Sequence, residues 1–377
     1  MNTHTNRTWV MDRRGFLKVA ATSAAMAAAG SLAGCDAKEA YDRAVTGKRT
    51  ITDDAGRELE IPAPEKLEKI YFTSSLAQVW VFTINPGKQG GSCSDFTAEQ
   101  LQYLPEGIDE LPRMGAISEN AQIDKEMLMA QGIQLVFSIS GVGLTETNVS
   151  DAETLQEQTG IPVVLVDGSF DRIATAYRFV GDIMGEDERA EELATYCENK
   201  YNEVVAAVAN VPEDKRTRIY YAEGPQGVQT DSSESQHALT FKLAGAENVA
   251  KDIEVIRFGK TSVNLEKVIE WDPEVIFAVD EDNGGCDQTI RTDKDWAGVK
   301  AVKDDAVYTI PYCPFSWVDS PPGINRLIGI MWVANLLYPD YYNVDMVEVT
   351  KEFYKTMYWV DITDDQARDL LGSSYAG

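Results

Sequence analysis

The residues best suited to chemistry lie within the first 35 positions. Arg13 and Arg14 directly precede Gly15-Phe16-Leu17-Lys18, and a later run of small residues closes on Leu32-Ala33-Gly34-Cys35. The arginine pair is typical of a twin-arginine export signal, and the second motif is typical of a lipoprotein cleavage box with an acylated cysteine. The apolar run over 19–33 is too short and too rich in alanine for a span of about 20 strongly apolar residues. We therefore predict a signal peptide over 1–34 and a lipid anchor on Cys35.

Hydrolytic chemistry has little support in the sequence. There is no Gly-x-Ser-x-Gly elbow, and His237 is the only histidine outside residues 1–34. The stretch Gly259-Lys260-Thr261 is similar to the end of a phosphate-binding loop, but position 254 is Glu where that motif needs Gly. A lone histidine is more often a core or surface residue than part of a triad. We predict no catalytic residue, and an exported α/β hydrolase is the less favoured alternative.

Composition excludes a metal ion held by several histidines, and we expect no metal site and no cofactor. Metal that arrives inside a chelate is compatible with this composition. Four cysteines besides Cys35 are scattered with no Cys-x-x-Cys pair: Cys93, Cys197, Cys286 and Cys313. Export permits disulfides, and four cysteines allow three complete pairings, so disulfides and buried free thiols both stay open.

The chain is strongly acidic, with a formal net charge of −27. Residues 1–34 hold four basic residues and one acidic residue, so their removal leaves a charge of about −30. This charge argues against a nucleic-acid partner and against broad adhesion to anionic lipid. The remaining chain is long enough for two domains with full cores.

Strand-like and helical segments alternate after a polar stretch over 35–50, which we predict to be a flexible tether. Apolar runs predict strands at 70–72, 135–139, 162–166, 218–222, 275–279 and 306–310. Periodicity predicts helices at 76–84, 171–184, 186–211 and 325–337. Such alternation implies mostly parallel sheets. The helix over 186–211, on the order of 35–40 Å long, could cross between two domains. The predicted boundaries are an N-terminal lobe over 51–168, linking helices over 169–212 and a C-terminal lobe over 213–377.

Candidate ligand-binding residues are those in loops that follow strands, because ligands of parallel sheets bind beyond the carboxyl ends of the strands. In the first lobe they are Ser74, Ser75, Arg113, Ser138 and Ser140. In the second lobe they are Tyr221, Glu223, Arg257, Phe258, Asn283, Phe315 and Trp317. Aromatic walls suit a large, flat ligand, and an arginine would orient an anionic group on it. The serines at a helix start would instead suit a small oxyanion. Packing or loop capping explains any single residue equally well.

Two segments 140 residues apart repeat the same texture. Glu126 begins a short helix, a turn and a strand, and Glu266 does the same in the second half. A negative charge is favoured in the first turn of a helix, so each glutamate alone is an ordinary surface residue. The repetition favours a paired role and a duplicated topology.

Several motifs together resemble the substrate-binding lipoproteins of ABC importers for ferric siderophores, haem and cobalamin. They are Ile51-Thr52-Asp53-Asp54-Ala55-Gly56-Arg57, Leu111-Pro112-Arg113-Met114-Gly115, the run from Asn264-Leu265-Glu266 to Asp272-Pro273-Glu274-Val275-Ile276, and the run from Trp296 to Tyr308. The resemblance covers nearly the whole chain after residue 35. It implies an α/β fold with two Rossmann-like lobes joined by one long helix, the class III periplasmic-binding-protein fold.

The resemblance also implies a function. The protein would be a monomeric receptor on the outer face of the membrane, capturing an iron chelate (ferric siderophore or haem) for an ABC permease dimer driven by a cytoplasmic ATPase. Cobalamin, another corrinoid, or an oxyanion such as molybdate is the alternative ligand. In this family a glutamate on each lobe docks onto permease arginines, and the matching positions here are Glu126 and Glu266. The first copy departs from the family pattern at Ile133-Gln134, where Pro-Asp is usual.

Overall fold

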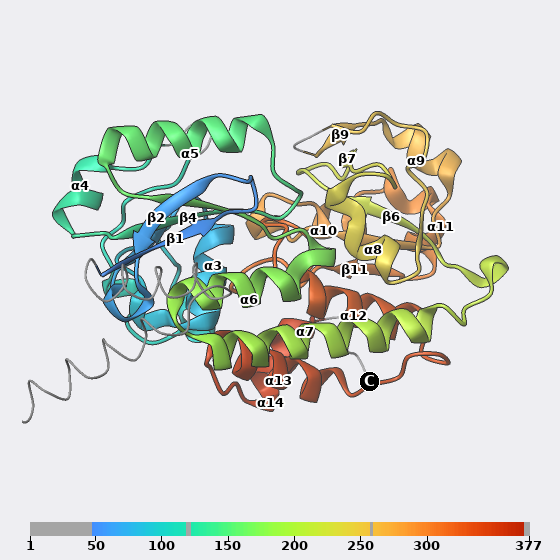
Figure 1. The fold of residues 1–377 in the computed structure, drawn as a ribbon. Helices are drawn as coiled ribbons and strands as arrows, with labels where there is room; N and C mark the ends of the chain where they lie inside the picture. The colour runs from blue at the N-terminus through green and yellow to red at the C-terminus, as the bar shows by residue number, and fades with distance from the viewer. Residues whose placement is uncertain (1–46, 118–121, 257–258, 373–377) are drawn as a thin grey trace, which may run out of the picture.

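The computed structural model describes residues 47–117, 122–256 and 259–372, arranged as two lobes above a layer of helices (Figure 1). The predicted signal peptide, Cys35 and nearly all of the predicted tether lie outside these residues, as do Arg257 and Phe258.

The described chain opens with an antiparallel hairpin of β1 (Lys48–Thr52) and β2 (Glu58–Pro62). Its turn is organised by the buried carboxylate of Asp53, which accepts hydrogen bonds from the backbone N–H of Ala55 and Arg57. The Arg57 guanidinium lies 2.6 Å from the same carboxylate. Because Asp53 also accepts from the N–H of Leu165, the hairpin is tied to the N-terminal sheet.

The N-terminal lobe is built on a parallel sheet of three strands in the order β3-β4-β5. Their bounds are Ile70–Phe72, Leu135–Ser140 and Val163–Asp167. The helices of this lobe are α3 (Ser75–Ile84), α4 (Lys125–Ala130) and α5 (Glu146–Thr159). The strands are almost wholly buried, which is typical of parallel sheets covered by helices on both faces.

The C-terminal lobe repeats this plan with a parallel sheet in the order β11-β10-β6-β8. Its strands are β6 (Arg218–Ala222), β8 (Glu247–Asn248), β10 (Val275–Ala278) and β11 (Val307–Thr309), and a separate antiparallel pair is formed by β7 (Gln229–Thr230) and β9 (Thr261–Ser262). Its helices are α8 (Leu239–Leu243), α9 (Leu265–Trp271), α10 (Asp287–Thr292) and α11 (Lys300–Lys303).

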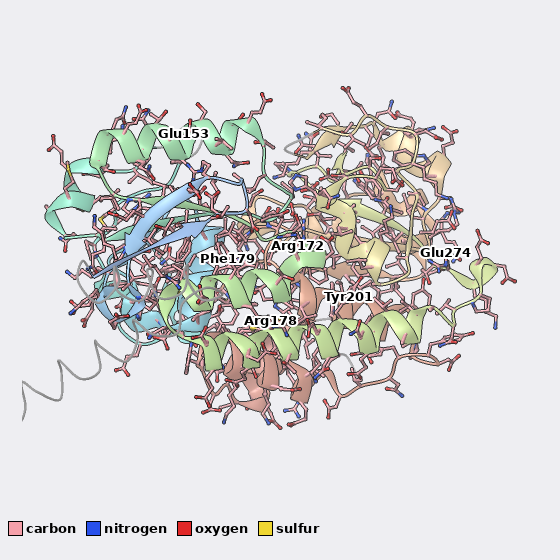
Figure 2. The ribbon with its side chains drawn as sticks, viewed as in Figure 1. Glu153, Arg172, Arg178, Phe179, Tyr201 and Glu274 are labelled. Carbon is pink, nitrogen blue, oxygen red and sulfur yellow. The ribbon has the colours of Figure 1, made fainter. Side chains whose placement is uncertain are left out.

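Two consecutive helices connect the lobes. The first, α6 (Ile173–Met184), ends at Gly185, whose φ of +71° reverses the chain into α7 (Asp187–Val208). Arg178 on α6 lies over α7, where its guanidinium contacts Glu191 and Glu198 (Figure 2). The 22 residues of α7 span about 33 Å and run beneath both lobes (Figure 1). The predicted linking helix is thus present.

The last three helices return along α7. They are α12 (Arg326–Leu337), α13 (Met346–Tyr358) and α14 (Asp364–Leu371). Although α12 belongs to the C-terminal half of the sequence, α13 packs on the N-terminal lobe, where Tyr358 stacks against Phe82 and Tyr354 against Tyr103. The indole of Trp359 donates to the carbonyl of Phe82 at 2.9 Å. The predicted C-terminal lobe over 213–377 therefore needs correction, since its last helices fasten onto the other lobe.

One apolar core runs through both lobes, from β4 through α7 and α12 to Phe277 and Trp332. A second, smaller core covers the far face of the C-terminal sheet around Trp296. Each of the six strands and four helices predicted from the sequence is present, with ends displaced by at most three residues. In the described part of the chain no helix has the length and apolar character needed to cross a bilayer.

Candidate ligand-binding site between the lobes

The lobes touch where their strand ends face each other. A Cβ placed on Gly141, directly after β4, would lie 2.2 Å from the carbonyl oxygen of Pro322 in the C-terminal half. A Cβ on Gly323 would lie 2.8 Å from the side chain of Leu76 in α3. The end of β4, the start of α3 and the loop over 320–323 therefore converge on one junction, with no room for side chains at the two glycines.

Hydroxyl groups gather on the N-terminal side of this junction. Ser74 caps α3 by accepting from the N–H of Ala77 at 3.2 Å, and Ser75 lies 3.2 Å from the hydroxyl of Ser94. Ser140, at the end of β4, donates to the carbonyl of Gly143 at 2.5 Å. Ser74, Ser75 and Ser140 are half-buried, so their hydroxyls line the wall without being lost in the core.

The other two predicted residues of this lobe lie deeper or farther out. Ser138 is buried and accepts from the hydroxyl of Thr73 at 3.1 Å, so it supports the wall from behind. Arg113 is exposed and its guanidinium lies 2.6 Å from the carboxylate of Asp95. It stands at the rim, next to the segment that carries Ser94.

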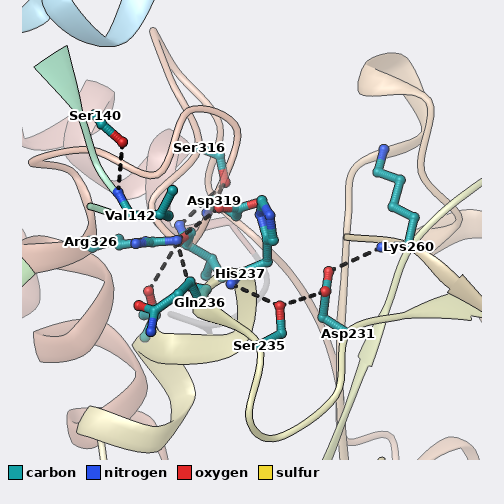
Figure 3. Close-up of polar contacts among 12 residues, drawn as sticks. Ser140, Val142, Asp231, Ser235, Gln236, His237, Lys260, Ser316, Asp319 and Arg326 are labelled. Carbon is teal, nitrogen blue, oxygen red and sulfur yellow. Dashed lines mark hydrogen bonds and ion pairs between the residues drawn. The ribbon is translucent and has the colours of Figure 1, made fainter. Parts of the chain in front are cut away.

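The C-terminal side is organised by the buried carboxylate of Asp319 (Figure 3). It accepts from the Arg326 guanidinium at 3.0 Å and lies 2.8 Å from Nδ1 of His237. Arg326 also donates to the carbonyls of Val318 and Gln236, and only 1% of its surface is exposed. A fully buried guanidinium with three such partners fixes the loop over 316–326 against the start of α8.

A second acidic group lies behind His237. Asp231 accepts from the hydroxyl of Ser235 at 2.8 Å and from the backbone N–H of Lys260 at 3.3 Å. Gly259 has a φ of +75°, and a Cβ there would lie 2.8 Å from the Asp231 carboxylate, so the close approach of this loop requires glycine.

Glu223 completes this cluster and is 2% exposed. Burial, reinforced by the neighbouring Asp231 carboxylate, raises the pKa of Glu223 to about 8, and Lys260 opposes that rise. At neutral pH Glu223 is therefore mostly protonated. The remaining charges of Asp231 and Asp319 are balanced by Lys260 and Arg326, so the site is near neutral within a strongly acidic chain.

The aromatic residues predicted to form a wall lie elsewhere, which corrects that expectation. Trp317 has no exposed surface; its indole N–H donates to Tyr354 at 3.3 Å and its ring packs on Trp332. Tyr221 is 2% exposed and packs on Phe241. Phe315 crosses between the lobes to meet Phe96, with ring centroids 6.2 Å apart.

Sequence reasoning missed the charged residues that organise the site. Asp231, Asp319 and Arg326 were not singled out, and His237 was weighed only as a catalytic candidate. Asp319 stands in Val318-Asp319-Ser320-Pro321, an irregular stretch in which a carboxylate gives no sign of its burial. The proline-rich character of this loop was the available signal.

A larger cavity, of about 710 Å³, opens at one end of the junction. It is bounded by Thr97 and Gln100 of the N-terminal lobe, by the loops after β10 and β11, and by the end of α14. Gln100 donates to the carbonyl of Pro314 at 3.0 Å, which closes one side. Five carboxylates line it, against a single arginine: Glu99, Asp280, Asp282, Asp287 and Asp369, with Arg291. The predicted residue Asn283 and the half-buried Tyr312 also line it.

Within residues 47–117, 122–256 and 259–372, no three His, Cys, Asp or Glu side chains are arranged to hold a metal ion. The four cysteines of this part of the chain are all buried free thiols. The question left open by their spacing is thus answered in favour of thiols.

Two α/β lobes joined by a long helix, with polar groups where the strand ends meet, define a class of solute-binding proteins, and similarity places the chain in it. Residues 134–312 match the family model described as periplasmic binding protein. The structure of an ABC transporter solute binding protein from Sulfurospirillum deleyianum is 28% identical, with a TM-score of 0.76 over 85% of this chain and 98% of that one. Residues 134–312 belong to the periplasmic binding protein family, and the described chain has the class III fold predicted from the sequence.

A curated relative is the molybdate-binding protein MolA of Haemophilus influenzae, 29% identical over 198 residues. That alignment covers 52% of this chain and 54% of MolA, so it spans about half the length of the relative. The structure of MolA bound to molybdate is 22% identical, with a TM-score of 0.67 over 84% of this chain and 99% of that one. The matched family consists of solute carriers, so the chain is a binding protein and not an enzyme, and its place is outside the cytoplasm.

Proposed function

We propose that this protein is the solute-binding component of an ABC importer and that it carries a small oxyanion of the molybdate type. The observation that supports this most directly is the junction itself. Half-buried hydroxyls at the start of α3 and the end of β4 face a near-neutral cluster that holds His237 and a buried arginine. Hydroxyls and free N–H groups at a helix start are the donors that oxyanions prefer.

The charge balance supports an anionic solute in spite of the chain's net charge. With Glu223 protonated, two carboxylates are matched by two cations, and His237 adds a positive charge when protonated. The similarity to MolA points in the same direction. The aromatic residues that a flat chelate would need are buried at Tyr221 and Trp317.

A metal chelate is a second candidate because the cavity of about 710 Å³ has the volume for one. Five lining carboxylates would repel a polyanionic siderophore, so the chelate would have to be neutral or cationic. A ferric siderophore of that kind, haem and cobalamin are the ligands to test there.

The remaining parts of the proposal concern delivery. We propose that the protein leaves the cytoplasm by the twin-arginine route and is held at the outer face of the membrane through Cys35 as a monomer. Glu126 and Glu266 dock it onto the two halves of a permease dimer with a cytoplasmic ATPase. Both glutamates are exposed in the first turns of α4 and α9, and both helices lie along the upper edge of the molecule (Figure 1).

The test is a thermal-shift panel on the purified chain without its signal peptide, using molybdate, tungstate, a neutral ferric siderophore, haem and cobalamin, with sulfate and chloride as controls. At 100 times Kd a ligand should stabilise the protein by about 2.7 kcal/mol. A shift with molybdate or tungstate supports the oxyanion proposal, and a shift with a chelate alone replaces it with the second candidate. No shift with any of them contradicts both.

A further inference from the structure

Two exposed apolar side chains occupy equivalent places on the two lobes. Met129 on α4 is 50% exposed and Ile269 on α9 is 42% exposed. Each lies three positions after a glutamate, Glu126 or Glu266, so each acid and its apolar neighbour share one face of a short helix. We call each combination an acid–apolar pair: Glu126 with Met129, and Glu266 with Ile269.

The two helices are equivalent by topology as well as by sequence. α4 leads into β4, which lies between β3 and β5, and α9 leads into β10, which lies between β6 and β11. Each acid–apolar pair therefore occupies the same place in its own lobe, which a random scatter of surface residues would not produce.

Each pair is held in a fixed orientation. Asp124 caps α4 by accepting from the N–H of Met127 at 2.9 Å, and Asn264 caps α9 by accepting from the N–H of Lys267 at 2.9 Å. Leu128 and Val268, the residues just before the exposed apolar ones, are fully buried and anchor the helices on their sheets. With one residue driven inward, its neighbours on the opposite side must face outward.

The glutamates have no use within the described fold. Within the described parts of the chain, neither Glu126 nor Glu266 forms an ion pair or a side-chain hydrogen bond, whereas Lys267 beside the latter is paired with Glu270. A carboxylate without a partner next to an exposed apolar side chain calls for a surface that offers both a cation and an apolar contact.

We propose that the two acid–apolar pairs form one bipartite docking surface for the permease, with Met129 and Ile269 as its apolar anchors. The proposal rests on the proposed function and specifies the partner's chemistry: two equal sites, each with a basic group beside an apolar depression. A second copy of this chain is a poor occupant, because it would set glutamates against glutamates on a molecule that is already strongly acidic.

Charge and apolar contact contribute differently to binding. Exposed charges chiefly steer the encounter and are screened by salt, so the glutamates should act on the association rate. Buried apolar contacts chiefly slow dissociation and are insensitive to salt. The two halves of each pair can therefore be separated in one binding experiment.

The experiment measures binding of the full chain to the permease–ATPase complex that supports uptake in the native host, reconstituted in nanodiscs. The Met129→Ser, Ile269→Ser double variant should bind about tenfold more weakly, through faster dissociation at all salt concentrations. The Met129→Leu, Ile269→Leu variant should bind as the native chain does. The Glu126→Gln, Glu266→Gln variant should associate more slowly and lose its salt dependence, and Glu188→Gln on exposed α7 is the charge control.

Unchanged dissociation of the serine variant overturns the proposal while native binding leaves the proposed function standing. Absence of any binding by the native chain contradicts the proposed function instead. Sedimentation of the native chain as a dimer that the serine substitutions dissociate would assign the surface to self-association and overturn the proposal as well. Equal solute affinity of all variants, measured by thermal shift, establishes that they are folded.

Discussion

The carboxylate of Asp319 lies 3.0 Å from the guanidinium of Arg326, and both side chains are almost wholly buried. The two residues stand seven positions apart, and the loop between them is the part of the C-terminal half that touches the N-terminal lobe. This ion pair therefore fixes the junction at which the solute is proposed to bind.

Replacement of this arginine should be strongly destabilising. Arg326→Met leaves the Asp319 carboxylate buried with His237 as its remaining charged partner, and breaking a buried pair typically costs about 3–5 kcal/mol. Urea unfolding measures the loss. The control is Arg178→Met, whose ion pairs with Glu191 and Glu198 are exposed and should contribute about 0–1 kcal/mol. Equal losses for the two variants would show that the Asp319 pair is not critical.

Glu223 should make stability fall as the pH rises. The pKa of Glu223 is raised from 4.5 to about 8 by burial, so the folded protein holds this proton more tightly than the unfolded chain does. The unfolded chain releases it first above pH 4.5, and the loss of stability grows until the pH passes about 8. Each pKa unit is about 1.4 kcal/mol, so the total is on the order of a few kcal/mol.

Glu223→Gln removes this titration, so the variant should gain stability over the native chain at pH 8 and differ little at pH 4.5. Urea midpoints between pH 4.5 and 9 measure the difference, with the exposed Glu188→Gln as control. Parallel pH profiles for the native chain and Glu223→Gln would contradict the protonated state of Glu223 on which the charge balance of the site depends.

Removal of one hydroxyl should separate solute binding from helix capping. Ser74 caps α3 by accepting from Ala77, and Thr363 caps α14 by accepting from Gln366, both at 3.2 Å. Ser74→Ala and Thr363→Ala should each lose about 1 kcal/mol of stability. Only Ser74→Ala should also weaken molybdate binding, by about tenfold in Kd, as measured by calorimetry. If both variants keep the native affinity, Ser74 is a cap and nothing more.

The four described thiols should be unreactive in the native protein. Burial raises the pKa of Cys93, Cys286 and Cys313 to about 12 and raises that of Cys197 further. A thiol-specific reagent should label none of the four until the chain is unfolded, because the thiolate is the reactive form. A reductant should leave Tm unchanged. Rapid labelling of the native protein, or a Tm that falls with reductant, would contradict this prediction.

The sequence predicts the fold well because its signals are local. A continuous apolar run such as Val163–Val166 can only be a buried strand or a core helix, and its brevity selects the strand. The long helix α7 is likewise determined by periodicity, and Gly185 marks its separation from α6. These features depend on neighbours within a few positions.

The site is harder to predict because its contacts are long-range. His237 and Asp319 are 82 positions apart, and nothing near either residue indicates the other. Trp317 was predicted to face the ligand because its loop is irregular, but irregular backbone does not reveal which way a large ring points. The return of α13 to the N-terminal lobe depends on Tyr354 and Tyr358, whose partners Tyr103 and Phe82 lie far away in sequence.

Three ties cross between the lobes: α7, the seat of α13 on α3, and the contact of Phe96 with Phe315. A container fastened at three places does not spring open by itself, so its cargo leaves only when something outside levers the halves apart. The ATP-driven machinery that receives the cargo would then have to supply that work, and uncontrolled leakage on the way to the membrane would be suppressed by the same fastenings.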